Sequence, residues 1–125
     1  NDMLHLTMNF IKERKAIGKK ISKFKNAQFT IAEIATDIHL GRTFVDGLIC
    51  KHMNGENILT EVSMAKYWIT EMSKRISDKC MQLHDGYGNM GDDKIARRHR
   101  DIPLTTFFTG TDETVKLLIA KNIGF

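Results

Sequence analysis

The spacing of hydrophobic residues along the chain predicts an α-helical protein. Apolar positions recur at the three-to-four-residue interval of a helix in three long segments, which we expect to span residues 4–16, 27–53 and 60–84. In the third segment the interval is close to 3.5 residues, which is typical of the seam of a helical bundle. The residues of this seam are Val62, Ala65, Ile69, Met72, Ile76, Cys80 and Leu83.

Helix-ending and helix-starting residues agree with this division. Gly18 and the Asn54-Gly55 pair are predicted to end the first two helices. Thr60 and Thr111 are predicted N-caps, because each is followed by acidic residues that suit the positive end of a helix. The remaining predicted helices are shorter and cover residues 93–100 and 111–122. No strand pattern competes, so the predicted fold class is all-α, an antiparallel (up-and-down) four-helix-bundle-like domain over residues 1–125.

Composition is that of one ordinary globular domain. The chain has 125 residues, of which 42% are hydrophobic and 27% charged. It contains no apolar run long enough to span a membrane, and its first residues do not resemble a secretory signal, so we expect an intracellular protein. Cys50 and Cys80 both fall on apolar-periodic stretches, and we expect both to be reduced residues of the core.

The basic residues favour a small anionic ligand. The formal net charge is +4, and the basic residues concentrate in two distant segments, residues 13–20 and 94–100. The second segment lacks interleaved aromatic residues and any helix-turn-helix or zinc-finger signature, so nucleic acid is not the expected partner. The five histidines form no HExxH pair and there is no CxxC, so no metal site is expected.

Glycines follow or precede the predicted helices in places where a bare backbone can approach a phosphate. Gly86 and Gly88 lie in the stretch MQLHDGYGNM after the third helix, and Gly110 precedes the predicted cap Thr111. For any one of these glycines taken alone, helix capping is the simpler explanation. Asp85 directly precedes Gly86, and its carboxylate would repel an anion bound there.

The order of these motifs resembles the C-terminal helical domain of the acyl-CoA dehydrogenases. The family pattern has an Arg-Lys-x-Phe-Gly turn, a Met-Ala-Lys, a Gln-x-x-Gly-Gly-x-Gly loop, an Arg-Asp pair and a Gly-Thr-x-Glu/Gln helix start. In this chain the corresponding segments are residues 14–18, 64–66, 82–88, 100–101 and 110–113. The resemblance runs without an evident gap from about residue 8 to residue 121.

The resemblance implies an FAD-dependent oxidoreductase of fatty acid metabolism. Members of the family dehydrogenate an acyl-CoA to a trans-2-enoyl-CoA: a Glu removes the α proton and the flavin receives a hydride from the β carbon. The resemblance also implies a homodimer or homotetramer, an electron-transfer flavoprotein as partner, and a location in the mitochondrial matrix or the bacterial cytoplasm.

The same resemblance assigns expected roles to individual residues. Arg14 would reach the phosphates of an FAD that belongs largely to the neighbouring subunit, and Lys25 stands where a Gln is usual but can still meet a phosphate. The other implied FAD contacts are Gln82, Asp85 and Gly86 along the adenosine diphosphate, and Thr111 and Glu113 at the start of the last helix. Thr109 and Gly110 would border the acyl-CoA thioester.

No catalytic base is expected in this segment. Thr109 occupies the position that holds the catalytic Glu in many members, and in another branch the Glu lies earlier on the first helix. Two interpretations stay open. In the first, the chain is a piece of a longer dehydrogenase that also has N-terminal helical and middle β domains. Its start inside a predicted helix favours this interpretation. In the second, it is a degenerate, non-catalytic bundle that acts in protein–protein contact. A third and weaker hypothesis is a dehydrogenase-like flavoprotein that binds DNA through residues 94–100.

Overall fold

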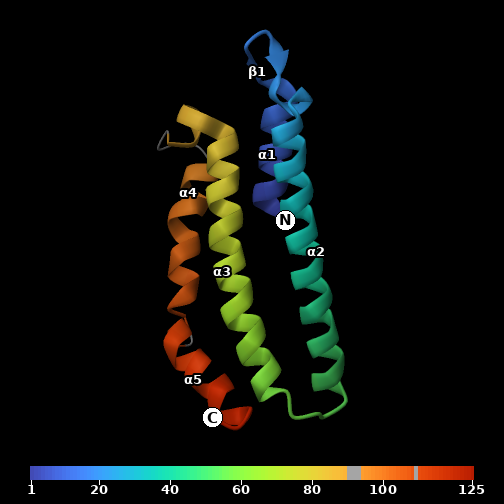
Figure 1. The fold of residues 1–125 in the computed structure, drawn as a ribbon, viewed down its shortest axis with the longest axis vertical. Helices are drawn as coiled ribbons and strands as arrows, with labels where there is room; N and C mark the ends of the chain where they lie inside the picture. Colours follow the sequence, from blue (N-terminus) through green and yellow to red (C-terminus); the bar gives the residue numbers. More distant parts are fainter. Residues whose placement is uncertain (90–93, 109) are drawn as a thin grey trace.

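A computed structural model describes residues 1–89, 94–108 and 110–125, and over these ranges the chain is an antiparallel helical bundle (Figure 1). The α-helices are α1 (Asp2–Glu13), α2 (Lys25–Met53), α3 (Leu59–His84), α4 (Lys94–Asp101) and α5 (Asp112–Asn122). Short 3₁₀ turns join them at η1 (Ile21–Lys23), η2 (Asp85–Asn89) and η3 (Ile102–Thr106). Two strands of two residues each, β1 (Lys15–Ala16) and β2 (Lys19–Lys20), form a small hairpin.

Helix α3 is the central element of the bundle. It runs antiparallel to α2 and packs against α1, α2, α4 and α5, with α4 and α5 following one another along its side (Figure 1). The prediction of an all-α, antiparallel bundle is therefore confirmed. Within the described residues, no helix is both long enough and apolar enough to cross a membrane.

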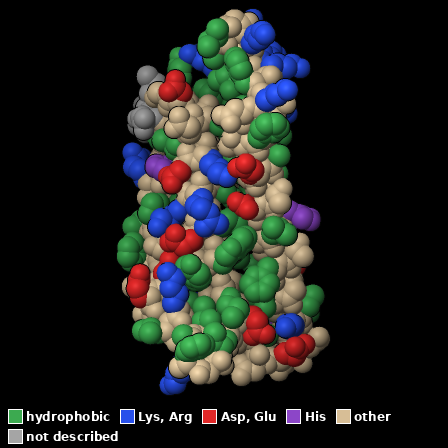
Figure 2. Space-filling view, in the orientation of Figure 1, with side chains coloured by type: hydrophobic (Ala, Val, Ile, Leu, Met, Phe, Trp, Pro, Cys, Tyr) green, Lys and Arg blue, Asp and Glu red, His purple; other side chains and the backbone are tan. Residues whose placement is uncertain are grey.

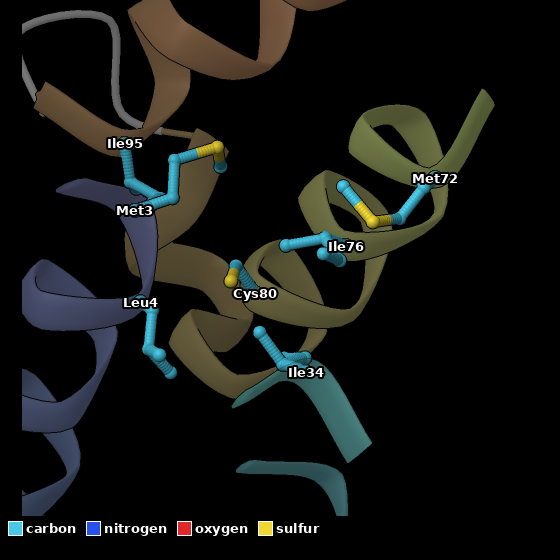
Figure 3. Packing of buried hydrophobic residues seen from close by; sticks show 7 residues of the cluster. All are labelled: Met3, Leu4, Ile34, Met72, Ile76, Cys80 and Ile95. Atoms are coloured by element: carbon cyan, nitrogen blue, oxygen red, sulfur yellow. The ribbon is translucent and has the colours of Figure 1, made fainter. Parts of the chain in front are cut away.

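The core lies where four helices meet. Figure 3 shows Met3 and Leu4 of α1, Ile34 of α2, Ile95 of α4 and the α3 residues Met72, Ile76 and Cys80 packed together. The predicted seam on α3 is confirmed along most of its length, but Val62 at its beginning is 45% exposed because α1 is short and does not reach it. Such burial supplies most of the stability of a bundle.

The two cysteines differ. Cys80 is fully buried, and its burial raises the pKa of the thiol above 9.0. Cys50 lies on the outer surface of α2, so the prediction that it belongs to the core is wrong. The reason is that the lower half of α2 packs on one side only, which leaves part of its apolar stripe, including Ile49, open to solvent.

The first helix ends earlier than predicted, and the strand-free prediction is also wrong there. Helix α1 stops at Glu13, and the next residues form the β1–β2 hairpin, in which Lys15 pairs with Lys20. The two turn residues, Ile17 and Gly18, have φ angles of 50° and 75°. Positive φ at both central positions is the geometry of a two-residue hairpin turn, and only Gly18 suits it well.

The predicted caps have different outcomes. Thr111 caps α5 as predicted, and its hydroxyl accepts a hydrogen bond from the Thr114 backbone N–H at 3.4 Å. Thr60 does not cap α3, because the helix begins one residue before it, at Leu59. The side chain of Asn57 accepts from the Leu59 N–H at 3.2 Å instead. The helix predicted over 93–100 runs from Lys94 to Asp101, and Asp93 lies outside the described residues.

An apolar groove runs between α2 and α3 below α1. Its upper part starts at Asn1 and Met3 and continues along both long helices, and its lower part reaches the turn before α3. The two parts share the side chains of Val45, Ile49 and Ile69. Figure 2 shows hydrophobic side chains reaching the surface over the lower half of the face it presents, with Lys and Arg around the hairpin end of the molecule.

Candidate functional site

Arg14 and the glycine loop lie next to one another in the structure. Arg14 directly follows α1, and its guanidinium lies over the ring of Tyr87, 4.1 Å from the ring centroid. It also donates a hydrogen bond to the Tyr87 hydroxyl. Tyr87 belongs to η2, which follows α3, so this contact joins the ends of two helices that are 73 residues apart in sequence.

A pair of stacked rings lies next to the contact between Arg14 and Tyr87. Phe10 of α1 stacks on the buried His84 of α3, with ring centroids 4.2 Å apart and planes inclined by 16°. The Phe10 ring also lies 6.0 Å from that of Tyr87. Sequence reasoning gave no role to Phe10 or Tyr87. The spacing of Phe10 and Arg14, four residues apart on one helical face, was the available signal.

The loop after α3 has an unusual backbone at Asp85. This residue has φ 51° and ψ −139°, a region that glycine adopts far more readily than any residue with a side chain. Among the described residues Asp85 makes no ion pair with Lys25, Arg14 or any other cation. Its side chain is exposed to solvent.

The two glycines of this loop have different surroundings. A Cβ on Gly88 would come within 3.2 Å of the Met81 side chain and 3.3 Å of the His84 Cβ, so a larger residue there would have to displace these side chains. A Cβ on Gly86 would meet no atom within 4 Å, so contacts inside the described chain do not require glycine there. Gly86 lines a small polar pocket, the other residues of which are Asp78, Met81, Gln82, Asp85 and His99.

Lys25 is the first residue of α2 and is exposed. It forms no ion pair with the described residues, so its positive charge faces solvent. Together with Arg14 and the three lysines of the β1–β2 hairpin, it makes this end of the bundle basic. An anion approaching this end meets mostly positive side chains, although the exposed carboxylates of Glu13, Asp78 and Asp85 oppose it.

The second predicted group lies elsewhere on α3. Thr111 and Glu113 stand at the N-terminus of α5, both exposed, and Gly110 has φ 115°. This end of α5 is attached to α3 through Lys66, which precedes Gln82 by sixteen positions, or about 24 Å along the helix axis. The structure therefore separates the two groups of predicted FAD contacts. Thr109 lies outside the described residues.

Lys66 is the residue that holds the start of α5, and sequence reasoning assigned it no role. Its ammonium donates to the Thr106 carbonyl at 2.7 Å, to the Gly110 carbonyl at 2.8 Å and to the Asp112 carboxylate at 2.7 Å. The Lys66 side chain is only 17% exposed and that of Asp112 only 9%. Burial alone would raise the pKa of Asp112, but the hydrogen bond and the charge of Lys66 outweigh it and hold this pKa below 3.8.

The sequence matches a known domain over nearly its whole length. Residues 1–124 match the family model for the acyl-CoA dehydrogenase C-terminal domain. This chain belongs to the acyl-CoA dehydrogenase family. The five motifs that carried the resemblance thus identify the family correctly, and the described helices form its all-α C-terminal domain.

Relatives with known names and structures agree with this family. The chain is 37% identical over 121 residues to the mitochondrial long-chain specific acyl-CoA dehydrogenase of Sus scrofa, covering 97% of this chain and 28% of that protein. It is 33% identical over 113 residues to subunit CarC of the caffeyl-CoA reductase-Etf complex of Acetobacterium woodii, covering 90% and 30%. The crystal structure of an acyl-CoA dehydrogenase from Geobacillus kaustophilus superimposes with a TM-score of 0.95 at 53% identity, covering 98% and 32%.

These relatives are much longer than the chain described here. It spans less than a third of the length of each of them. The comparisons therefore establish the family and the domain, and they include both mitochondrial and bacterial proteins.

Proposed function

We propose that this domain works within a longer flavoenzyme that moves two hydrogens between the α and β carbons of an acyl-CoA thioester. The observation that carries the proposal is the match of residues 1–124 to the C-terminal domain of the acyl-CoA dehydrogenases. In the longer protein, an N-terminal helical domain and a middle β domain would complete the site. Bound FAD would accept the hydride that leaves the β carbon.

Two groups of side chains support FAD as the cofactor. At the hairpin end, Arg14 is held against Tyr87 with the rest of its guanidinium donors still available to a phosphate, and Lys25 adds a second positive charge. At α5, the first-turn N–H groups lie beyond Thr111, where an intrahelical partner is lacking and a negatively polarised group is favoured. These residues fit a phosphate-bearing cofactor, with the carboxylates of Asp85 and Glu113 as the unfavourable charges.

The separation of the two groups supports an oligomer. The two groups of predicted FAD contacts lie about 24 Å apart along α3, so it is simpler for them to contact two different FAD molecules than a single one. We propose that Arg14, Lys25, Gln82, Asp85 and Gly86 face the FAD of a neighbouring subunit in a homodimer or homotetramer. Thr111 and Glu113 would face the FAD of their own subunit, and Thr109 and Gly110 would border the thioester.

The catalytic base would come from outside this segment. A threonine hydroxyl is not a base at neutral pH, so Thr109 cannot take that part. We propose a Glu on a segment that precedes Asn1 and continues α1. The apolar groove that starts at the first residues of α1 and runs between α2 and α3 supports this, because a continued helix would cover it.

The electron partner and the direction of reaction are part of the proposal. The name of the Acetobacterium relative includes both a reductase and an Etf, which supports an electron-transfer flavoprotein as partner and leaves either direction chemically open. We propose acyl-CoA oxidation to the trans-2-enoyl-CoA as the forward direction, in the mitochondrial matrix or the bacterial cytoplasm.

The test is flavin absorbance of the purified full-length protein, meaning the natural chain that contains this domain. We expect a yellow protein whose flavin band bleaches when a suitable acyl-CoA is added and returns when an enoyl-CoA is added. A colourless protein that does not take up FAD would contradict the proposal. The 125-residue chain alone should bind FAD weakly, because it supplies one wall of the site, and tight uptake by that chain would show this expectation wrong.

A non-catalytic bundle that acts in protein–protein contact is the second candidate. The exposed Asp85 at a position where the family has glycine, and the exposed apolar side chains Leu40 and Phe44 along α2, favour it. A full-length protein that lacks flavin but captures a partner through α2 would favour this candidate over the enzyme.

A further inference from the structure

Lys66 connects three groups that lie on both sides of the turn leading into α5. Two of its acceptors are backbone carbonyls, Thr106 at the end of η3 and Gly110 just before the helix. The third is the carboxylate of Asp112, the first residue of α5. An ammonium group has three donors, so all three are used, and the turn is closed across the side of α3.

We propose that Lys66 is the positioning residue of the α5 N-terminus, fixing the direction in which Thr111 and the first-turn N–H groups meet the cofactor. This inference rests on the proposed function, because the cofactor it refers to is FAD. Lys66 itself would not touch FAD. It would act through the backbone at Gly110 and the side chain at Asp112.

Two physical effects make this role specific to Lys66. The first is geometric: Gly110 has φ 115°, a conformation that mainly glycine adopts, and the Lys66 bond to its carbonyl restrains this permissive residue. The second is electrostatic: the Asp112 carboxylate at the helix N-terminus would repel a phosphate-bearing ligand if its charge were not paired. Lys66 pairs that charge inside a largely buried contact, where salt screens it little.

The chain offers matched controls for the test. Lys79 lies on the same helix and pairs with Glu33 of α2 at 2.7 Å, at a more exposed site. Ile76 is buried in the core formed by α1, α2, α3 and α4, and none of the described residues in that core belongs to α5. Lys79→Met therefore controls for loss of a lysine from α3, and Ile76→Val controls for loss of stability without loss of the Lys66 contacts.

The experiment compares Lys66→Met, Lys66→Arg and the two controls in the full-length protein. FAD affinity is measured by titrating the apoprotein and following the flavin absorbance, and backbone hydrogen exchange over residues 106–113 is followed by mass spectrometry. We expect Lys66→Met to weaken FAD binding about tenfold or more and to speed exchange in this segment. Ile76→Val, matched for its loss of thermal stability, and Lys79→Met should change neither quantity.

Lys66→Arg keeps the inference testable if Lys66→Met does not fold. Arginine preserves the charge beside Asp112, but its planar fork cannot direct single bonds to three separate acceptors. It should fold, keep Asp112 paired and still bind FAD more weakly than the natural protein. FAD affinity and exchange equal to those of the natural protein in Lys66→Arg or Lys66→Met would overturn the inference, as would a loss of affinity that Ile76→Val reproduces.

The two proposals can fail separately. If the natural full-length protein binds no FAD, the proposed function fails. Hydrogen exchange over residues 106–113 needs no FAD, so it still decides whether Lys66 fixes the start of α5. Unchanged exchange in Lys66→Met would then overturn the positioning role as well.

Discussion

Replacing Asp85 by glycine should make the domain more stable. Asp85 has φ 51° and ψ −139°, and a residue with a side chain in such a region costs about 1–3 kcal/mol relative to glycine. Glycine gives back about 0.4–1 kcal/mol of that gain, because it increases the freedom of the unfolded chain. The exposed Asp85 side chain makes no ion pair within the described residues that would offset this, so the net gain is about 1 kcal/mol.

Thermal unfolding of the 125-residue chain measures this gain. For a domain of this size, about 1 kcal/mol corresponds to a rise of roughly 4 °C in the unfolding midpoint. Asp85→Asn is the matched control, since asparagine keeps the side-chain size and the backbone strain but removes the charge. A midpoint that is unchanged or lower in Asp85→Gly would refute the reasoning from backbone strain.

The same two variants separate strain from charge in cofactor binding. If Asp85 faces an FAD phosphate across about 4 Å, the repulsion is roughly 4 kcal/mol at a surface-like dielectric, and exposure to solvent lowers it further. In the full-length protein we expect both Asp85→Gly and Asp85→Asn to bind FAD at least about tenfold more tightly. Equal affinities in all three proteins would mean that the Asp85 carboxylate points away from the cofactor.

Three further predictions follow from the hairpin, the ring stack and the buried ion pair. Ile17→Gly should raise the free energy of unfolding by about 1 kcal/mol, because a β-branched residue at φ 50° is strained. Urea unfolding measures this change, and an unchanged midpoint would contradict the prediction. Tyr87→Phe should weaken FAD binding by the full-length protein less than Tyr87→Leu does, because the phenylalanine ring still supports Arg14; equal losses would argue against the stacking contact. The pKa of Asp112 is lowered in the folded state, so its pairing with Lys66 stabilises the fold above about pH 4 and this stabilisation is lost as the pH falls further. Asp112→Asn should therefore flatten the pH dependence of the urea midpoint below about pH 4. A variant with the same pH dependence as the natural chain would exclude the ion pair.

The long helices could be predicted because their apolar positions repeat over many turns. On α3, the spacing of the apolar residues from Ala65 to Cys80 was regular enough to identify the face that packs into the bundle. The hairpin at Lys15–Lys20 could not be predicted in this way. Its strands have two residues each, too few for an alternating pattern to register, and its first turn residue is an isoleucine, which the turn geometry disfavours.

The candidate site was predictable in its sequence motifs and not in its contacts. The glycines and Arg14 were recognisable because their spacing along the chain matches a family pattern. The hydrogen bonds of Lys66 to the turn before α5 join residues 40 to 46 positions apart in the sequence. Two of the acceptors are backbone carbonyls, which no side-chain motif reveals. The contact between Arg14 and Tyr87 likewise depends on how the ends of α1 and α3 meet.

Helix α3 carries one group of predicted cofactor contacts near each end. The number of residues between the two groups is therefore constrained, whereas the lengths of the loops are not. One residue inserted between Lys66 and Gln82 would turn one group by about 100° relative to the other and shift it by about 1.5 Å. A chimaera between two relatives should therefore keep this helix intact and place its junction in the exposed turn at 54–57. In a comparison of natural sequences, gaps should be tolerated in that turn and absent from the middle of α3.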